Sequence, residues 1–277
     1  MSNERRVIVH QDKLSLTGAV AARFITKVVD LQDEQPEVNI VLTGGTVGIG
    51  VLAAINASPA RDNVDWSRVQ LWWGDERWLP RGHQDRNDQQ ARDALLDHVA
   101  LRPENIHYFP SSDGDLELDA AAAHYAEELA SAGDGSPLPH FDITFLGVGP
   151  DGHIASLFPN REGIRVADST VVGVRNSPKP PQERLSLTIG AINSSDRVWL
   201  VMAGEDKASA LGLALAGVSM FEVPAAAAQG RKRTVFFVDR DAAAEVPGDL
   251  IATDYSRSRA AGVATSRSAC RAVHGAA

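Results

Sequence analysis

The stretch FDITFLGVGPDGHIASLFP, residues 141–159, decides between two kinds of α/β protein. Gly147, Gly149 and Gly152 spell G-x-G-x-x-G directly after an apolar run that is typical of a β-strand. This spacing is the fingerprint of a turn that binds the pyrophosphate of a dinucleotide, provided that a full helix begins at the turn. His153 follows the last glycine, so the same turn could instead present a catalytic group.

Two requirements for dinucleotide binding fail in the sequence. Pro159 follows Gly152 so closely that at most two helical turns fit between them. Asp168 has the spacing of the acidic residue that binds the ribose, but it precedes the apolar run TVVGV instead of ending it. We therefore predict no nicotinamide or flavin cofactor. We expect the glycines to form a tight strand-to-helix turn that presents Asp151 and His153.

The composition is that of a globular protein with a sizeable core, because 44% of the 277 residues are hydrophobic and 23% are charged. The net charge of −9 argues against a nucleic-acid or anionic-membrane surface, although a locally positive cleft could still bind an anion. The single cysteine, Cys270, excludes an intramolecular disulfide framework and a cysteine-based zinc site, and predicts a reducing, cytoplasmic setting. We expect no signal peptide, since Arg5 and Arg6 lead into a strand-like VIVH, and no run has the ~18 apolar residues of a membrane span.

Short β-branched runs alternate with segments of helical periodicity. This alternation predicts one α/β domain over residues 1–246, with a mostly parallel sheet and helices on both faces. The expected strands are Arg6–His10, Glu37–Leu42, Val69–Trp73, Ile106–Tyr108, Ile143–Leu146, Thr170–Val174, Leu185–Leu187, Val198–Met202 and Thr234–Val238. The expected helices are Lys13–Gln32, Gly48–Ala57, Asn87–Ala100, Leu116–Ala132 and Asp206–Ala216. Residues 247–277 are rich in small residues, Ser and Arg, so we expect a disordered or loosely attached tail.

The segment NIVLTGGTVGIG, residues 39–50, is typical of a phosphate-binding turn between a strand and a helix. Gly44 and Gly45 would let the backbone approach an anion, and the amides at the helix start, near Thr46, would attract it. The segment lacks the Gly-Lys-Ser/Thr of a nucleotide P-loop, so a sugar phosphate fits better than a nucleoside triphosphate. The alternative is a plain turn in which Thr46 caps the helix.

Two further strand ends carry charged candidates. In VQLWWGDERWLP, residues 69–80, Arg77 offers a planar donor fork for a phosphate or carboxylate, and Asp75 could hold a sugar hydroxyl or the histidine. In VWLVMAGEDKASAL, residues 198–211, Lys207 opens a helix, where its charge opposes the helix dipole unless an anion is bound. Arg184 is a weaker candidate for the same anion.

With these strand ends, the chain resembles the glucosamine-6-phosphate isomerase/6-phosphogluconolactonase family from about Val7 to Ala244. The segments that carry the resemblance are LTGGTVG, WWGDERWLP, FLGVGPDGHIASLFP, RLSLT, GEDKASAL and VPAAAAQGRKRTVFFVD. The resemblance implies a modified Rossmann-like domain with no cofactor and no metal. It implies His153 as the catalytic base with Asp151 close by, and a substrate pocket formed by Gly44, Gly45, Thr46, Arg77, Arg184 and Lys207.

The family has two branches that differ after DGHIA. The isomerase branch continues with Asn-Glu-Pro, whose glutamate serves ring opening, whereas this chain continues with Ser156-Leu157-Phe158-Pro159 and so resembles the lactonase branch. In one departure, Asn87 follows Arg86 where the family usually has a serine, and this leaves the role of that position open.

The lactonase branch implies hydrolysis of 6-phospho-D-glucono-1,5-lactone to 6-phosphogluconate, a step of the oxidative pentose phosphate pathway. We expect His153 to activate water, with Arg77 or backbone amides near Gly149 stabilising the oxyanion. Ser156 is the alternative nucleophile. The alternative functions are aminosugar-phosphate isomerisation with deamination, a sugar-phosphate sensor without turnover, and an inactive scaffold. We expect a monomer or a weak homo-oligomer with a small-molecule partner.

Overall fold

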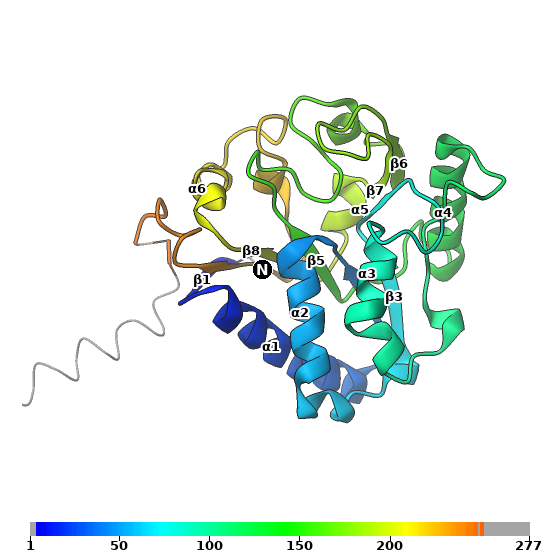
Figure 1. The fold of residues 1–277 in the computed structure, drawn as a ribbon, viewed down its shortest axis with the longest axis horizontal. Coiled ribbons are helices and arrows are strands. Elements are labelled where there is room, and N and C mark those ends of the chain that lie inside the picture. The colour runs from blue at the N-terminus through cyan, green and yellow to red at the C-terminus, as the bar shows by residue number, and fades with distance from the viewer. Residues whose placement is uncertain (1–3, 249, 252–277) are drawn as a thin grey trace, which may run out of the picture.

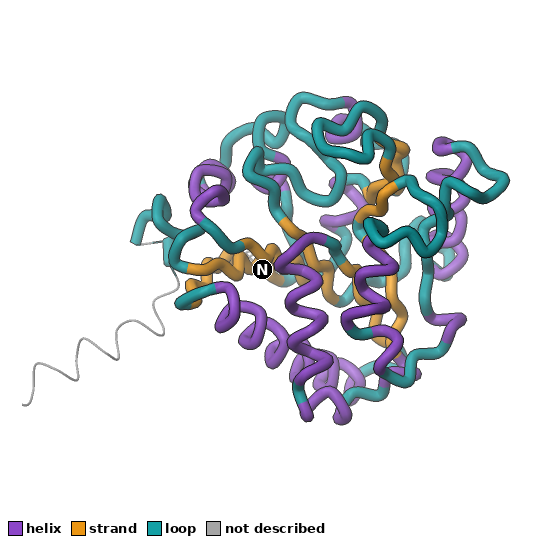
Figure 2. The backbone as a smooth tube through the Cα atoms, viewed as in Figure 1, coloured by secondary structure: helices purple, strands orange, loops and turns teal. Residues whose placement is uncertain are grey.

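The computed structural model describes residues 4–248, 250 and 251 (Figures 1 and 2). Its strands are β1 (Glu4–His10), β2 (Val38–Leu42), β3 (Val69–Trp73), β4 (Asp75–Arg77), β5 (Ile143–Gly147), β6 (Val171–Val174), β7 (Arg184–Leu187), β8 (Arg197–Met202) and β9 (Arg233–Asp239). Its α-helices are α1 (Lys13–Glu34), α2 (Gly45–Ala57), α3 (Asn87–Ala94), α4 (Leu118–Ala132), α5 (Ile189–Asn193) and α6 (Ala208–Leu215).

The main sheet has six strands in the order β1-β9-β8-β5-β2-β3, and every pair in it is parallel. The chain adds β3 on one side of β2, and it adds β8 and β9 on the far side of β5. The direction of strand addition therefore reverses between β2 and β5. In parallel sheets the carboxyl ends of strands at such a reversal flank a crevice that binds ligands. The predicted α/β fold class is confirmed.

The sheet is buried because helices cover both of its faces. Phe145 on β5 points toward α1, where it packs against Phe24 at 5.7 Å between ring centroids. Neighbouring residues along a strand point to opposite faces. Accordingly Thr144 lies on the other face, on the same side as Trp72 of β3, whose ring contacts Tyr125 of α4. Figure 1 shows α1, α2 and α3 along one side of the sheet.

A second, smaller sheet of order β4-β7-β6 is antiparallel. The sequence predicted Leu185–Leu187 and Thr170–Val174 as strands, but it did not predict their separate sheet, and it treated residues 75–77 as a loop. Gly74 makes the transition between the sheets. Its amide donates to Leu42 in the main sheet, and its carbonyl accepts from Leu187 in the small one. Figure 2 shows long loops gathered at the end of the molecule where this small sheet lies.

Two expected elements are wrong in extent. Ile106–Tyr108 is not a strand, since Ile106 forms only an isolated bridge to Leu71, and Pro110 has no amide hydrogen to extend the pairing. The helix expected over Asn87–Ala100 ends at Ala94, and a 3₁₀ turn over Leu96–His98 follows. The remaining expected elements are present, with ends shifted by no more than three residues. The short helix α5 was not predicted.

The predicted tail, residues 247–277, lies mostly outside the described residues. Within the described part, Ile251 bridges Val7 beside β1. None of the helices in residues 4–248, 250 and 251 has both the length and the apolar character needed to cross a membrane.

The aromatic contact between α1 and the sheet yields a stability prediction. Phe24 is 1% exposed between Phe145 and Trp66, so Phe24→Ala should lower the free energy of unfolding by about 3–5 kcal/mol. Leu14 lies on the same helix and is 83% exposed, so Leu14→Ala should change it by less than about 0.5 kcal/mol. Urea unfolding followed by circular dichroism measures both values. Equal losses in the two variants would contradict this packing.

Candidate active site

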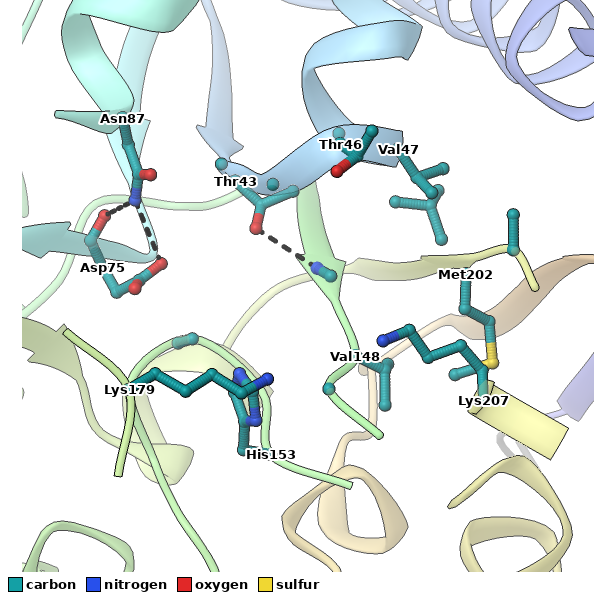
Figure 3. A pocket seen from close by; sticks show the side chains of 18 of the residues that line it. Thr43, Thr46, Val47, Asp75, Asn87, Val148, His153, Lys179, Met202 and Lys207 are labelled. Carbon is teal, nitrogen blue, oxygen red and sulfur yellow. Dashed lines mark hydrogen bonds between the residues drawn. The ribbon is translucent and has the colours of Figure 1, made fainter. Parts of the chain in front are cut away.

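A cavity of about 520 Å³ opens at the carboxyl ends of β2 and β5, where strand addition reverses direction (Figure 3). Five Lys or Arg side chains line it, against only two aspartates, on a protein with a net charge of −9. Its cationic residues are Lys13, Arg77, Lys179, Arg184 and Lys207. Such a cavity is electrostatically suited to a small anion.

His153 is held at the cavity by Asp151. The Nδ1 atom of His153 lies 2.5 Å from Oδ1 of Asp151, and the imidazole packs against Phe158 with 4.6 Å between ring centroids. Burial alone would raise the pKa of Asp151, but the hydrogen bond and charge of His153 lower it to about 2. An ionised carboxylate on Nδ1 favours the tautomer that keeps the Nδ1 proton and leaves Nε2 free to accept one.

The pair requires a glycine at position 149. A Cβ atom built on Gly149 would collide with the ring of His153 and with the carboxylate of Asp151. Gly149 also ties the loop together, since its amide donates to the carbonyl of His153 at 2.9 Å and its carbonyl accepts from Gly152. The glycines of this segment therefore shape a turn around the histidine.

The expected strand-to-helix turn is wrong, because no helix follows β5 before residue 162. Instead Val148 and Ile154 form an antiparallel bridge, and the backbone enters the left-handed region at Gly152 (φ 79°) and again at Ala155 (φ 48°). Ala155 also lines the cavity. Because no helix begins at this turn, there are no amides of a helix N-terminus to hold a pyrophosphate. The described segment therefore does not have the dinucleotide-binding geometry.

The three side chains of β4 point alternately to the two sides of the strand. Asp75 and Arg77 line the cavity, whereas Glu76 points to the opposite side and is buried. The Nη1 atom of Arg77 donates to the carbonyl of Asp85 at 2.5 Å, and within the described residues its buried Nε has no hydrogen-bond partner. Arg77 is thus anchored at one nitrogen and carries an unsatisfied donor.

Asp75 does not contact His153. Its Oδ2 accepts a hydrogen bond from Oγ of Ser156 at 2.7 Å, and the side-chain amide of Asn87 donates to its carbonyl at 2.8 Å and to Oδ1 at 3.4 Å. The possibility that Asp75 orients the histidine is therefore wrong in this structure. Asp75 instead joins three segments around the cavity: β4, the loop after β5, and the start of α3.

The Gly-Gly-Thr turn lies across the cavity from His153 (Figure 3). Gly44, Gly45 and Thr46 all line it, and Gly45 has a φ of 80°, which a glycine adopts without strain. The residue that caps α2 is Gly44, so the alternative in which Thr46 is the cap is wrong. A Cβ atom on Gly44 would collide with the amide of Asn87, whose buried Oδ1 has no hydrogen-bond partner in the described chain.

The two remaining predicted residues also line the cavity. Lys207 precedes α6, and its amine lies 2.9 Å from Asp206. In Figure 3 this amine and the His153 ring both point into the space below Thr43 and Thr46. Arg184 is more constrained, because its Nε and Nη2 donate to backbone carbonyls of residues 179–181, and burial lowers its pKa.

Sequence reasoning missed Lys13, Lys179 and Asn87 as cavity residues. Lys13 opens α1 directly after β1, so the rule that identified Lys207, a lysine that opposes the dipole at a helix start, would have found it. Lys179 lies in the segment NSPKPPQ, which has the composition of a surface loop and carries no comparable signal. Asn87 was noted only as a departure from a family pattern.

Comparisons with known proteins agree with this geometry. Residues 11–237 match the family described as glucosamine-6-phosphate isomerases/6-phosphogluconolactonase. The chain belongs to this family. It is 50% identical to a 6-phosphogluconolactonase of Streptomyces coelicolor over 90% of this chain and 98% of that protein, and 43% identical to one of Mycobacterium leprae over 87% and 98%. The crystal structure of a 6-phosphogluconolactonase from Thermotoga maritima superposes with a TM-score of 0.75 at 27% identity, over 86% of this chain and all of that one.

Arg86, which the sequence comparison with the family pattern marked as a departure, forms a buried ion cluster. Its guanidinium binds both carboxylate oxygens of Asp88 at 2.9–3.2 Å and lies 3.7 Å from Glu76. The carboxylate of Glu76 accepts from the amides of Arg77 and Asn87 at 2.7 Å and of Asp88 at 2.9 Å. This cluster fixes the two ends of the loop that separates Arg77 from Asn87.

The structure gives no reason to place a metal in the cavity. Within the described residues, the group that brings three potential metal ligands together is His140, Asp142 and Asp196. These residues precede β5 and β8, at the opposite ends of the strands from the cavity. The carboxylate of Asp196 already pairs with Lys232 at 2.6 Å and contacts the Nε2 atom of His140 at 3.1 Å.

The buried cluster predicts a pH dependence of stability. Burial raises the pKa of Glu76 from 4.5 to about 7. In the unfolded chain the carboxyl ionises near pH 4.5, so between about pH 4.5 and 7 the folded state binds more protons, and this group lowers stability as the pH rises. Glu76→Gln should remove this decrease in unfolding free energy with rising pH, whereas Glu104→Gln, at an exposed site, should not. Unfolding free energies from pH 4 to 8 test this, and identical pH profiles for Glu76→Gln and the unchanged protein would contradict it.

Proposed function

We propose that the chain hydrolyses 6-phospho-D-glucono-1,5-lactone to 6-phosphogluconate, the step of the oxidative pentose phosphate pathway that its relatives' name denotes. The observation that carries the proposal is the joint lining of one small cavity by a carboxylate-paired histidine and five cationic side chains. A phosphorylated lactone needs both: a group that removes a proton from water and a positive site for its phosphate.

In the proposed reaction His153 is the general base. Its Nε2 takes a proton from a water molecule as the water oxygen attacks the lactone carbonyl carbon. Asp151 stabilises the imidazolium that forms, through the short contact with Nδ1. The tetrahedral intermediate then expels the ring oxygen, which takes the proton back from Nε2. The single product is open-chain 6-phosphogluconate, which carries both the new carboxyl group and the released hydroxyl, and the histidine returns to its starting state.

Arg77 is the better of the two predicted oxyanion stabilisers. The amide of Gly149 already donates to the carbonyl of His153, so it is not available to a developing oxyanion. The buried Nε of Arg77 has no hydrogen-bond partner among the described residues, and the residue lines the cavity. A charged donor held by its anchor on Asp85 would need little reorganisation during the reaction.

Ser156 is unsuited to act as a nucleophile. Its side chain is fully buried, it is not among the residues that line the cavity, and its Oγ donates to Asp75. No histidine contacts it in the described residues, so no base activates its hydroxyl. A δ-lactone is an activated ester that water can open directly, so the proposed mechanism contains no acyl-enzyme.

Lys207 and the Gly44–Thr46 turn bind the phosphate in this proposal. Exposed amides at the start of α2 attract an anion, and the lysine adds a full charge from the facing side. The missing isomerase glutamate argues against aminosugar deamination, because Ser156 and Leu157 occupy that part of the loop. The cytoplasmic setting and the monomeric or weakly oligomeric state remain predictions.

Removal of the general base tests the chemistry. His153→Ala should lower kcat for the phosphorylated lactone by about 10²–10⁴-fold, with rates corrected for spontaneous lactone opening. His124→Ala, on the exposed side of α4, is the matched control and should keep full activity. A His153→Ala protein that folds and turns over at the unchanged rate would refute the assignment. A burst of lactone consumption ahead of the release of 6-phosphogluconate would refute the absence of an acyl-enzyme.

Removal of the phosphate ligand tests substrate selection. A charge-assisted hydrogen bond contributes about 1.5–3 kcal/mol, so Lys207→Ala should raise KM for the phosphorylated lactone roughly 10–100-fold with little change in kcat. The KM and kcat for the unphosphorylated lactone should not change, because this substrate lacks the group that the lysine binds. Lys232→Ala removes a lysine outside the cavity and is the control. An unchanged KM in Lys207→Ala would mean that the phosphate lies elsewhere.

A further inference from the structure

A second cavity, of about 430 Å³, lies between α1 and the strands β8 and β9. It shares no lining residue with the candidate active site. Among the residues that the structure describes, four of the lining side chains are cationic and none is a carboxylate. Its lining residues are Ala22, Arg23, Thr26, Lys27, Arg197, Trp199, Arg233, Val235 and Phe237.

The sheet itself brings two of these cations together. Arg197 and Arg233 are direct register partners on the neighbouring parallel strands β8 and β9. Adjacent like charges on a sheet repel each other, and together they make this wall of the cavity positive. The nearest carboxylate oxygen of Asp196 is 3.9 Å from Arg197, at the edge of ion-pair distance, and Lys27 is paired with Asp30 on the outer side of α1.

Two guanidinium groups have donor capacity that the described protein does not use. The Nη1 atom of Arg197 is buried and has no hydrogen-bond partner within the described residues. Arg23 is exposed to solvent and forms neither a hydrogen bond nor an ion pair there, and its guanidinium carbon lies 5.8 Å from the ring centroid of Phe237. A buried donor without an acceptor costs free energy, and a bound anion would remove that cost.

The rest of the cavity is apolar. Trp199, Val235 and Phe237 come from the strands, and the two aromatic rings contact each other edge to face at 5.4 Å. A low-polarity wall strengthens the attraction between a guanidinium and an anion. It also accepts a flat hydrocarbon ring, and the planar Arg23 guanidinium beside Phe237 can stack on one.

We propose that this second cavity binds a phosphate monoester that carries an aromatic ring, which is the chemistry of a mononucleotide. The phosphate accepts hydrogen bonds from Arg197 and its charged neighbours at the strand ends, and the ring lies along the apolar wall next to Arg23. This site is separate from the lactone site and does not depend on the function proposed for that site.

Calorimetric titration of the full chain with adenosine 5′-monophosphate tests the proposal, with ribose 5-phosphate and inorganic phosphate as the comparison ligands. We expect saturable binding of the nucleotide, at least about 10-fold tighter than either comparison ligand, because only the nucleotide supplies the ring. Arg197→Gln and Arg23→Gln should each weaken it about 10-fold or more. Arg240→Gln removes an exposed cation outside the cavity and should leave the affinity unchanged.

Binding to the first cavity must be told apart from binding to the second. Lys207→Ala should retain nucleotide affinity, and Arg197→Gln should retain lactone hydrolysis and the thermal unfolding midpoint. Loss of nucleotide binding in Lys207→Ala, or equal affinity of Arg197→Gln and the unchanged protein, would overturn the proposal. In the Lys207→Ala variant, whose sugar-phosphate site is weakened, equal affinity for ribose 5-phosphate and the nucleotide would overturn the role of the aromatic ring.

Discussion

The carboxylate of Asp75 is the constraint on which the candidate active site depends. It accepts from Ser156 in the loop that carries His153, and Asn87 at the start of α3 donates to the same residue. Asn87 is 12 residues from Asp75 in the sequence and Ser156 is 81 residues away, and the Asp75 contacts are buried. Buried polar groups must be paired, so a change in any one of the three segments leaves a partner unsatisfied. The loop that carries His153 is therefore positioned by the same strand that carries Arg77.

Strand alternation explains how three consecutive charged residues serve two environments. Asp75 and Arg77 face the cavity, and Glu76 faces the buried cluster with Arg86 and Asp88. A helix would have spread these side chains around its axis, whereas a strand sends them alternately to two sides. The cluster behind the strand holds the loop ends, and the cavity in front of it receives the arginine. One short strand thus couples the stability of the loop to the placement of a site residue.

Much of the fold was predictable because each strand and helix of the main sheet has a local signal. The positions of His153, Lys207 and the Gly44–Thr46 turn followed from one rule, that the carboxyl ends of parallel strands meet at one edge. The small sheet was not predictable, since β4 has three charged residues and pairs with a strand over a hundred residues away. The loop after β5 was also misread, because its left-handed turn at Ala155 depends on tertiary contacts that no local pattern encodes.

The net charge of −9 does not describe how charge is distributed over the protein, because two of its cavities are lined mainly by cationic side chains among their charged residues. Concentrating lysines and arginines in a concave site raises their mutual repulsion, and burial of Arg184 adds a desolvation cost that lowers its pKa. In the first cavity, backbone carbonyls accept hydrogen bonds from the guanidinium groups of Arg77 and Arg184. In the second, Arg23 and the Nη1 atom of Arg197 have no such acceptor in the described chain. In both cavities the gathered cationic side chains create a positive potential that an anion from solution can neutralise, and this is the physical link between the two proposed sites.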